Sequence, residues 1–244
     1  MKNCKKNVLI TGANTGIGKS ILKKFIKKKF KIIGTSRTKS GALKIQNKIQ
    51  DHGHGMILNI KNLSSIKNFL KKMKKKVQKI DILINNAAIT SDNLIINLSK
   101  KSWNKIIQIN LTSVFYITKK IIKNMIHARF GRIINIGSIS GFIGSAGQTN
   151  YAAAKSGLIG FTKSLSLEVA TQGITVNLVS PGFIQTNMLK NLTHRQLQKC
   201  LKKIPMRRLG KPQDIANMVE FLSSKKASYI TGQVFHVNGG ICSL

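Results

Sequence analysis

The segment 11–18 (TGANTGIG) places three glycines in a G-x3-G-x-G pattern directly after a short apolar run, and a helical pattern follows at once. Glycine has no Cβ, so the backbone can turn sharply here and lie close to a bound pyrophosphate. The start of the helix adds free N–H groups and the positive end of the helix dipole. The segment therefore predicts a strand–loop–helix unit that binds a dinucleotide. The residues expected to contact it are Gly12, Ala13, Asn14, Thr15, Gly16, Ile17 and Gly18.

Six further apolar runs alternate along the chain with helical patterns, of which 19–29 and 102–127 are the clearest. The expected strands are residues 7–10, 31–34, 56–58, 81–84, 132–136, 175–179 and 233–237. Their continuous apolar character is typical of strands that are buried on both faces of a sheet. The alternation predicts a single α/β domain over residues 1–244. Its expected architecture is a doubly wound, Rossmann-like parallel sheet of about seven strands, with helices on both faces in three αβα layers.

The chain carries 42 Lys and Arg against 6 Asp and Glu, which gives a formal net charge of +36. Lysine supplies 36 of the cations, while isoleucine also counts 36 and asparagine 21. Such a joint rise is typical of AT-rich codon usage, whereas a phosphate-binding surface would favour arginine. The lysine-rich stretches 23–29 and 71–76 are interpreted as solvated helix faces, because they lack the aromatic interleaving that stacks bases. Nucleic acid is therefore not the expected partner.

Cellular location and metal content are also bounded by composition. No apolar run approaches the ~20 residues of a membrane span, and the N-terminal stretch has no signal-peptide cleavage site. Cys4, Cys200 and Cys242 are odd in number, and neither they nor the five histidines show metal-ligand spacing. We expect a cytoplasmic protein that has no membrane association and no metal site.

Polar residues follow the expected strands at their carboxyl ends, where doubly wound sheets bind ligands. No Asp or Glu that could bind a ribose 2′-hydroxyl occurs before Asp51. Arg37 can instead pair with a 2′-phosphate, which predicts NADP(H) as the cofactor. Asn59 is expected to bond the adenine edge while Ile60 packs on the ring. Asn86 is expected to lie where the dinucleotide crosses the sheet.

Tyr151 and Lys155 are one helical turn apart, so the ammonium can lie beside the phenol and lower its pKa towards the working pH. Such a phenol can act as the general acid in carbonyl reduction. Ser138, just past the strand 132–136, can hydrogen-bond the same carbonyl oxygen of the substrate. A second Tyr-x3-Lys pair, Tyr116 and Lys120, lies beside an apolar helix stripe and is interpreted as structural.

Three further residues are expected near the reaction centre. Asn110 lies in the helical pattern 102–127, where its amide either joins two helices or holds a water next to Lys155 that passes protons from solvent. The turn 180–186 follows a strand end where nicotinamide should lie, so backbone groups near Ile184 and the hydroxyl of Thr186 are expected to hold its carboxamide. The polar segment 185–205 is interpreted as a substrate lid.

These motifs together resemble the short-chain dehydrogenases/reductases in order and spacing. The residues that carry the resemblance are TGANTGIG, the NNA segment at 85–87, Asn110, Ser138, Tyr151 with Lys155, and SPG at 180–182. Longer stretches, including SAGQTNYAAAKSGLIGFTKSL, GITVNLVSPGFIQT and YITGQVFHVNGG, look like bacterial members of that family that reduce 3-oxoacyl chains on acyl carrier protein. This closer resemblance covers essentially the whole chain.

The resemblance implies NADPH-dependent reduction of 3-oxoacyl-[acyl-carrier-protein] to the 3-hydroxyacyl form in fatty-acid elongation. Tyr151 would protonate the oxygen that Ser138 positions. Lys155 would hold the nicotinamide ribose and tune Tyr151, while Asn110 would complete a proton relay. A homotetramer is also implied, together with an acidic carrier protein that docks near the entrance and contacts Arg129.

Three positions depart from the family pattern. Ala88 stands where the family has the glycine of NNAG, and Gln172 where a basic residue precedes GITVN. The start of the lid reads QTNM at 185–188 where the family has an acidic, ETDM-like sequence. A positive φ at Ala88 would cost about 1 kcal/mol. Two other functions stay open: an NADPH-dependent reductase of a CoA thioester or other small ketone, and a basic nucleic-acid- or membrane-surface-binding protein on an inactive reductase scaffold.

Overall fold

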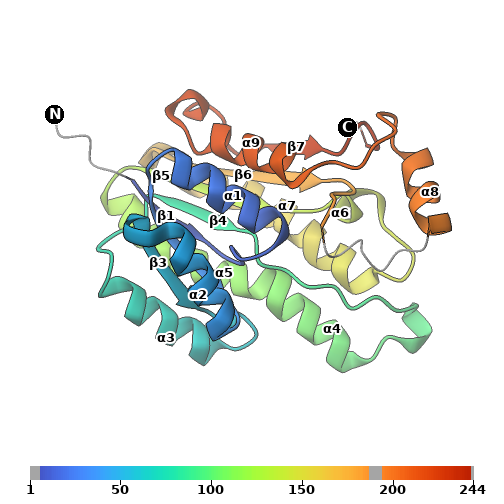
Figure 1. Cartoon of the computed structure of the whole chain (residues 1–244), viewed down its shortest axis with the longest axis horizontal. Helices are drawn as coiled ribbons and strands as arrows, with labels where there is room; N and C mark the ends of the chain where they lie inside the picture. Colours follow the sequence, from blue (N-terminus) through green and yellow to red (C-terminus); the bar gives the residue numbers. More distant parts are fainter. Residues whose placement is uncertain (1–5, 187–193, 243–244) are drawn as a thin grey trace.

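In the computed structural model, which describes residues 6–186 and 194–242, the expected strands pair in parallel as one sheet (Figure 1). The order across the sheet is β3-β2-β1-β4-β5-β6-β7. The strands are β1 Asn7–Ile10, β2 Lys31–Ser36, β3 Gly53–Ile57, β4 Ile82–Asn85, β5 Gly131–Ile136, β6 Ile174–Pro181 and β7 Val234–Val237. The predicted doubly wound α/β fold is confirmed.

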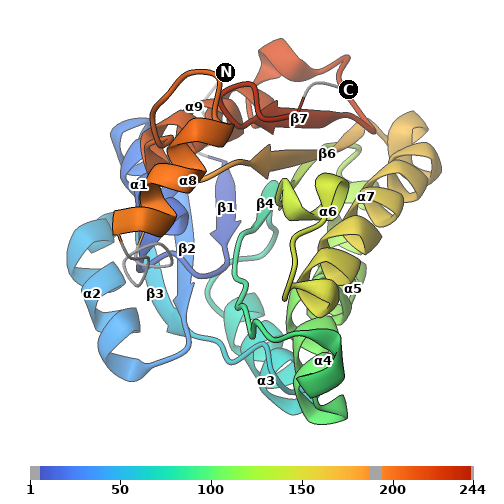
Figure 2. The ribbon, with the colours of Figure 1, turned by 90° about the vertical axis from the view of Figure 1, so that its right-hand side faces the viewer.

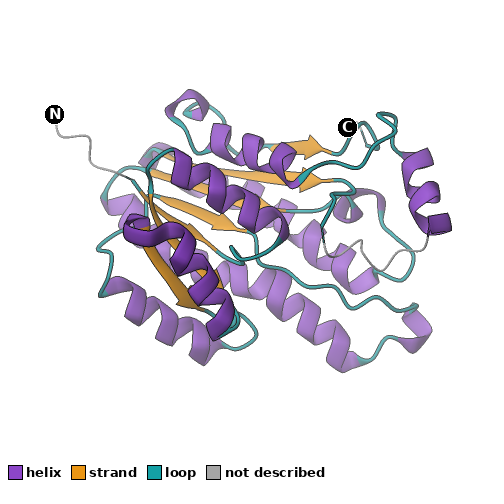
Figure 3. Ribbon diagram, viewed as in Figure 1, coloured by secondary structure: helices purple, strands orange, loops and turns teal. Residues whose placement is uncertain are grey.

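Helices cover both faces of this sheet (Figure 3). The α-helices are α1 Gly16–Lys27, α2 Lys39–Ile49, α3 Leu63–Lys74, α4 Lys100–Ile107, α5 Ser113–His127, α6 Ser140–Ile143, α7 Thr149–Val169, α8 His194–Lys203 and α9 Pro212–Leu222. Short 3-10 turns are η1 Gln50–His52, η2 Ile95–Asn97, η4 Ala170–Gln172 and η6 Lys225–Ala227. Helices α1, α2 and α9 pack on one face, and α3, α5 and α7 on the other.

Neighbouring residues of each strand serve opposite faces of the sheet. In β1, Val8 and Ile10 belong to the core under α1 and α9, while Leu9 belongs to the core under α3 and α5. All three side chains are fully buried. Each such burial stabilises the fold by about 1.5–3 kcal/mol, which explains why the strands have no polar face.

The third strand begins earlier than its apolar residues predict. Gly53 and Gly55 pair with Ile32 and Gly34 of β2. A Cβ at Gly53 would lie 1.9 Å from the carbonyl oxygen of Ile32, and one at Gly55 would lie 2.2 Å from that of Ala42 in α2. The two glycines therefore let α2 and β2 pack closely against this strand, a role that hydrophobic periodicity does not reveal.

The long helical pattern 102–127 is interrupted by a π-helical turn, η3 Gln108–Thr112, which joins α4 to α5. The N–H of Ser113 reaches back to the carbonyl of Gln108, and the Ser113 hydroxyl binds the carbonyl of Ile109 at 2.7 Å. The turn contains Asn110, which is 1% exposed. Single π turns inside helices frequently occur at functional sites.

A fully buried polar network joins the centre of the sheet to two helices. Asn85 Nδ2 of β4 donates to Asn135 Oδ1 of β5 at 2.9 Å and to Thr118 Oγ1 of α5 at 3.3 Å. Asn135 Nδ2 in turn donates to Thr162 Oγ1 of α7 at 2.9 Å. An unpaired buried amide would cost about 1–3 kcal/mol, so these bonds fix where α7 lies on the sheet.

Candidate active site

The carboxyl edge of the sheet faces the viewer in Figure 2, with α4, α6 and α8 around it. Because β1 pairs with both β2 and β4, the strand order reverses at β1. A reversal of this kind opens a crevice beyond the carboxyl ends of the two strands. The glycine loop, Ser138 and the turn after β6 all follow strands at this edge.

Asn86 braces the glycine loop from the end of β4. Its side-chain amide donates to the carbonyls of Thr11 at 2.8 Å and Gly12 at 3.1 Å. The Thr11 hydroxyl accepts the N–H groups of Asn86 and Ala87, each at 3.0 Å. The structure thus gives Asn86 a positioning role at the predicted crossing point of the dinucleotide.

Gly12 and Gly16 have positive φ values of 66° and 49°, a conformation that favours glycine. A Cβ at Gly18 would lie 2.1 Å from the carbonyl oxygen of Gly12, so the loop folds directly onto the first turn of α1. The side chain of Thr15, the N-cap, makes no capping hydrogen bond there. The first N–H groups of α1 are therefore left to bind an anion, and these donors fit a pyrophosphate.

Arg37 is exposed just past β2, and α2 begins two residues later at Lys39, which is also exposed. A Cβ at Gly41 would lie 2.0 Å from the Ser36 hydroxyl oxygen and 2.5 Å from Asn14 Nδ2, so the glycine loop and the start of α2 meet. Two cations at a helix N-terminus suit a phosphate monoester. The sequence reasoning missed Lys39, although its place at the start of a helical pattern was a usable signal.

Asn59 and Ile60 follow β3 at the same edge. Asn59 Oδ1 accepts the N–H of Lys61 at 3.1 Å, and its own N–H donates to the Ser65 hydroxyl at 3.2 Å. Ile60 packs against the core under α3. The side-chain oxygen Oδ1 of Asn59 therefore stabilises the turn, while its side-chain nitrogen Nδ2 has no partner among residues 6–186 and 194–242.

Tyr151 lies in the first turn of α7 and is 7% exposed. Burial raises the pKa of Tyr151 to about 12, because it disfavours the phenolate; a hydrogen bond with Ser138 opposes this shift and the charge of Asp92 adds to it. The expectation of a lowered pKa is therefore wrong. The Lys155 ammonium lies 5.6 Å from the ring centroid of Tyr151, and burial is the largest cause of the Tyr151 shift.

Lys155 is 3% exposed and donates from Nζ to the carbonyl of Ile136, the last residue of β5, at 2.7 Å. Burial lowers the pKa of Lys155 to about 8, since an ammonium loses hydration there. An ammonium has three N–H donors. Only the bond to Ile136 is formed within the described residues, so two donors remain for a ligand.

Asn110 clamps the segment that follows β4. Its Oδ1 accepts the N–H of Ile89 at 3.0 Å, and its Nδ2 donates to the carbonyl of the same residue at 2.8 Å. Both the oxygen and the nitrogen of the Asn110 side-chain amide are thereby hydrogen-bonded to Ile89. Of the two roles expected for Asn110, the structure supports a structural hydrogen bond, made to a loop of the site and not to another helix.

Three residues at the mouth of the site were missed from the sequence. Gln148 Nε2 donates to Asp92 at 2.8 Å, and Asn150 Nδ2 donates to the carbonyl of Ser91 at 3.1 Å. Asn150 Oδ1 also accepts the N–H of Tyr151 at 2.7 Å. These bonds hold the loop after β4 against the start of α7. The signal for Asp92 was its rarity, as one of six acids in the chain.

The turn after β6 reaches the glycine loop. A Cβ at Gly16 would lie 3.3 Å from Thr186 Cγ2. Ile184 is buried and forms a bridge with Gly210, whose carbonyl accepts the N–H of Gln185 at 2.8 Å. Ile184 and Thr186 therefore stand beside the crevice. Residues 187–193 of the predicted lid, like Cys4, lie outside the described residues.

The structure places Arg129 away from this site. Arg129 precedes β5, at the amino edge of the sheet, and its guanidinium donates to the carbonyl of Thr171 at 2.8 Å and to Gln172 Oε1 at 3.4 Å. The interpretation of Arg129 as a contact near the entrance is therefore wrong within one chain. Ser138 and Arg129 lie at opposite ends of β5, since a strand separates them.

The structure also bears on the expectations for Ala88 and Tyr116. Ala88 does not have positive φ; in the described part of the chain the non-glycine residues that do are Lys29, Gln50, Arg129 and Arg207. The alanine therefore adds no backbone strain. Tyr116 packs on the core under α3 and α5, as its interpretation as a structural residue requires.

Within the described ranges, no three His, Cys, Asp or Glu side chains gather as metal ligands. A search of those same residues finds no helix with the length and apolar character needed to cross a membrane. Cys200 and Cys242 are free thiols.

Residues 12–242 match a family model described as "Enoyl-(Acyl carrier protein) reductase". A relative from Buchnera aphidicola subsp. Schizaphis graminum, named 3-oxoacyl-[acyl-carrier-protein] reductase FabG, is 56% identical over 241 residues, which is 99% of either chain. Relatives with the same name from Vibrio cholerae and Escherichia coli are each 48% identical over 236 residues, or 97% of either chain.

The buried ammonium of Lys155 makes a prediction about stability and pH. Its pKa is about 8 in the folded chain against 10.5 ordinarily, so folding a charged Lys155 costs free energy below pH 8, and this cost disappears as the pH rises through both values. Lys155→Met removes the cost. The advantage of Lys155→Met in unfolding free energy over the parent should shrink by about 2–3 kcal/mol between pH 7 and pH 10. Urea unfolding measures it.

The exposed Lys120 belongs to the second Tyr-x3-Lys pair, and Lys120→Met is the matched control. Because its side chain is exposed, its stability difference from the parent should change far less than that of Lys155→Met over the same pH range. Equal changes for the two variants would contradict the burial argument.

Proposed function

The chain belongs to the short-chain dehydrogenase/reductase family, and on that premise we propose that it reduces 3-oxoacyl-[acyl-carrier-protein] to the 3-hydroxyacyl form in fatty-acid elongation, with NADPH as reductant. The observation that carries this proposal is the position of the buried Tyr151, whose pKa is affected by the Ser138 hydroxyl, with the buried Lys155 one helical turn away, at the edge where the glycine loop opens. The names of the relatives support the same substrate class.

Tyr151 is the proton donor of the proposed reaction. With a pKa raised to about 12, the phenol keeps its proton at neutral pH until a stronger base forms beside it. Reduction of a ketone creates such a base, since the carbonyl oxygen becomes an alkoxide as a hydride reaches the carbon. NADPH supplies that hydride when it is bound. The Ser138 hydroxyl holds the same oxygen, so the proton passes from Tyr151 in one step.

Lys155 restores the proton to Tyr151. Its pKa of about 8 lets the ammonium release and regain a proton near neutral pH. The Ile136 carbonyl fixes one N–H, and the two remaining donors suit ribose hydroxyls of the cofactor. Asn110 acts as a positioning residue in this proposal: by holding the Ile89 backbone, it shapes the place beside Lys155 where a proton-carrying water would lie.

The cofactor contacts follow the carboxyl edge. The loop 12–18 would hold the pyrophosphate, and Arg37 with Lys39 would bind the 2′-phosphate of NADP(H). Asn59 Nδ2 and Ile60 would face the adenine, while Ile184 and Thr186 would face the nicotinamide carboxamide. Asn86 would act through the loop that it braces.

Other substrates lead to different expectations. The description of the matching family model names enoyl reduction, in which a proton must reach carbon. A phenol and a hydroxyl that converge on one oxygen favour ketone reduction instead. A CoA thioester or a small ketone would use the same site without a protein partner. A nucleic-acid- or membrane-surface-binding role would leave the Ser138, Tyr151 and Lys155 geometry without a use.

The acidic carrier protein would dock at the carboxyl edge. Helix α8 lies there, and Arg195, Lys199 and Lys202 recur on it at the i, i+4 and i+7 spacing of one face (Figure 2). All three side chains are exposed. Complementary charge of this kind steers an acidic partner. An effect of Arg129 on docking would require a second subunit, because Arg129 lies at the other edge of its own chain.

Three further features complete the proposal. The chain would form one domain over residues 1–244, with segment 185–205 acting as the lid over the substrate. It would assemble as a homotetramer. It would work in the cytoplasm, where the carrier protein and NADPH are found together.

Tyr151→Phe tests the reaction. Loss of the proton donor should reduce kcat for acetoacetyl-[acyl-carrier-protein] by about 10²–10⁴-fold. The measurement is NADPH oxidation, with Tyr116→Phe as the matched control that should retain activity. Acetoacetyl-CoA and crotonyl-[acyl-carrier-protein] serve as alternative substrates. If the parent protein turns over neither acetoacetyl thioester, the reductase proposal is refuted. Faster turnover of the crotonyl substrate than of the acetoacetyl substrate would favour enoyl reduction. Equal efficiency with acetoacetyl-CoA and acetoacetyl-[acyl-carrier-protein] would argue against specificity for the carrier protein.

Arg37→Ala tests the choice of cofactor. A charge-assisted bond to phosphate contributes about 1.5–3 kcal/mol, so KM for NADPH should rise roughly 10–100-fold while KM for NADH stays constant. Lys31→Ala is the control, because Lys31 is an exposed cation at the amino end of the same strand. A parallel rise in both KM values would argue against recognition of the 2′-phosphate.

Charge reversal on α8 tests the docking surface. The double variant Lys199→Glu and Lys202→Glu should raise KM for the carrier-bound substrate about tenfold, as the loss of complementary rim charges predicts, and leave KM for acetoacetyl-CoA unchanged. Lys225→Glu with Lys226→Glu makes the same charge change in η6 and should alter neither KM. Equal effects of the two double variants would point to overall charge instead of a surface on α8.

A further inference from the structure

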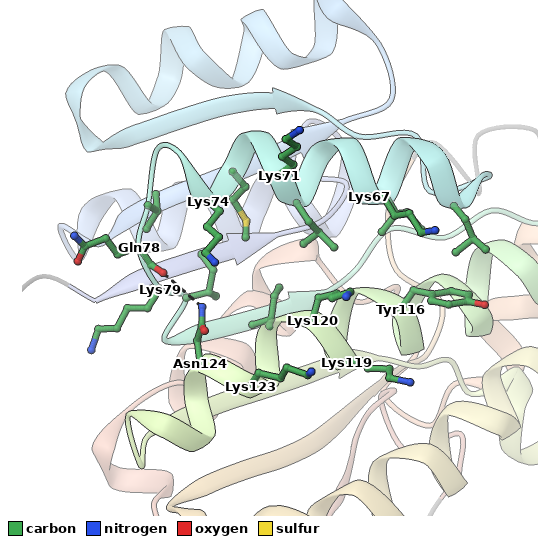
Figure 4. A pocket seen from close by; sticks show the side chains of 17 residues that line it. Lys67, Lys71, Lys74, Gln78, Lys79, Tyr116, Lys119, Lys120, Lys123 and Asn124 are labelled. Carbon is green, nitrogen blue, oxygen red and sulfur yellow. Dashed lines mark hydrogen bonds between the residues drawn. The ribbon is translucent and has the colours of Figure 1, made fainter.

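A groove between α3 and α5 is separate from the candidate active site, because no residue of that site lines it (Figure 4). Its floor is apolar, because Ile66, Met73 and Ile121 belong to the core beneath it and Leu70 and Val77 pack against that core. The cavity measures about 580 Å³. Small-molecule sites typically measure 300–1,000 Å³, so this groove is large enough for a ligand.

Exposed lysines form both rims of the groove. Three come from each helix: Lys67, Lys71 and Lys74 from α3, and Lys119, Lys120 and Lys123 from α5. On α3 they recur at the i, i+4 and i+7 spacing of one helix face. The amide of Asn124 donates to the carbonyl of Gln78 at 3.5 Å and joins the helices at one end, while Tyr116 stands at the other end (Figure 4).

The six rim lysines have no carboxylate partner in the described part of the chain. Lys79, which also lines the groove, differs from them because it pairs with Asp81 at 3.3 Å. Two rows of like charge along one apolar floor repel one another. An anion bound between the rows would remove this repulsion, and an apolar group attached to it would cover the floor.

We propose that the groove binds a single-chain amphiphile with a phosphate head, of the acyl glycerol phosphate type. A phosphate offers several acceptor oxygens and up to two negative charges, which matches several ammonium groups better than one carboxylate does. The acyl chain lies along the apolar floor, since the 12 residues of α3 make a helix about 18 Å long. The stretch 71–76 is thus more than a solvated face. The proposal is independent of the reductase function.

Isothermal titration calorimetry on the full chain, with 1-dodecanoyl-glycerol 3-phosphate below its micelle concentration, tests the proposal. Saturable binding should weaken as salt is raised, because exposed charges are screened. Glycerol 3-phosphate has no tail, and dodecyl phosphocholine has no net charge. Each should bind at least tenfold more weakly than the full probe. Dodecanoate, with a single negative charge, should also bind more weakly.

Two variants separate charge from shape. Lys71→Glu with Lys120→Glu should weaken the probe at least tenfold, while Lys23→Glu with Lys27→Glu on α1 makes the same change in net charge and should leave binding intact. Leu70→Trp fills the floor, keeps every lysine and should also weaken binding. Retained NADPH oxidation and a retained unfolding transition show that each variant is folded.

Four outcomes would overturn the proposal. The first is that the α1 variant weakens binding as much as the groove variant does, and the second is that the choline-headed probe binds as tightly as the phosphate probe. The third is binding to vesicles of anionic lipid without binding of the monomeric probe. The fourth is that binding is lost as chains associate at high protein concentration. The third would indicate a membrane surface, and the fourth would indicate that a second copy of the chain covers the groove.

Discussion

Parallel pairing of β1 with β2 on one side and β4 on the other is the constraint on which the candidate site depends. It brings the residue after β1 and the residue after β4 to one point, where the Thr11 hydroxyl accepts the N–H of Asn86. Every later strand ends at the same edge, so Ser138 and Ile184 arrive there without any local signal that directs them. The buried bonds from Asn135 to Asn85 and Thr162 then set the position of α7, and with it that of Tyr151.

Burial acts on the two titratable groups of the site in opposite directions. It raises the pKa of Tyr151 to about 12 and lowers that of Lys155 to about 8. In water these side chains hold a proton almost equally well, with ordinary values of 10.0 and 10.5. Inside the site the phenol becomes the better holder of the proton. Burial therefore favours the protonated phenol of Tyr151 and makes it easier for Lys155 to lose its proton, which are the properties that the proposed ketone reduction requires.

Local patterns predicted where the seven strands lie along the chain and which polar residues follow them, because apolar runs and glycine spacing act over a few neighbours. The start of β3 was missed, since Gly53 and Gly55 serve contacts with α2 and β2 that lie elsewhere in the chain. The π turn at Asn110 was hidden inside an unbroken helical period. The direction of the Tyr151 pKa and the position of Arg129 both depend on tertiary burial and topology. Helical spacing alone places Lys155 near Tyr151 but does not predict how far the two side chains are buried from solvent.

The scarce carboxylates clarify what the excess of lysine means. Asp81 accepts the N–H of Asn7 at 2.8 Å and ties β4 to β1. Glu220 pairs with Lys24 and Lys28 and ties α9 to α1. Asp214 accepts the N–H of Lys211 at 2.8 Å and starts α9. These anions thus stand where two elements, or a helix end, need one. Most lysines have no carboxylate partner in the described part of the chain, so positive charge by itself does not identify a binding site. The α3–α5 groove differs because its lysines surround an apolar floor.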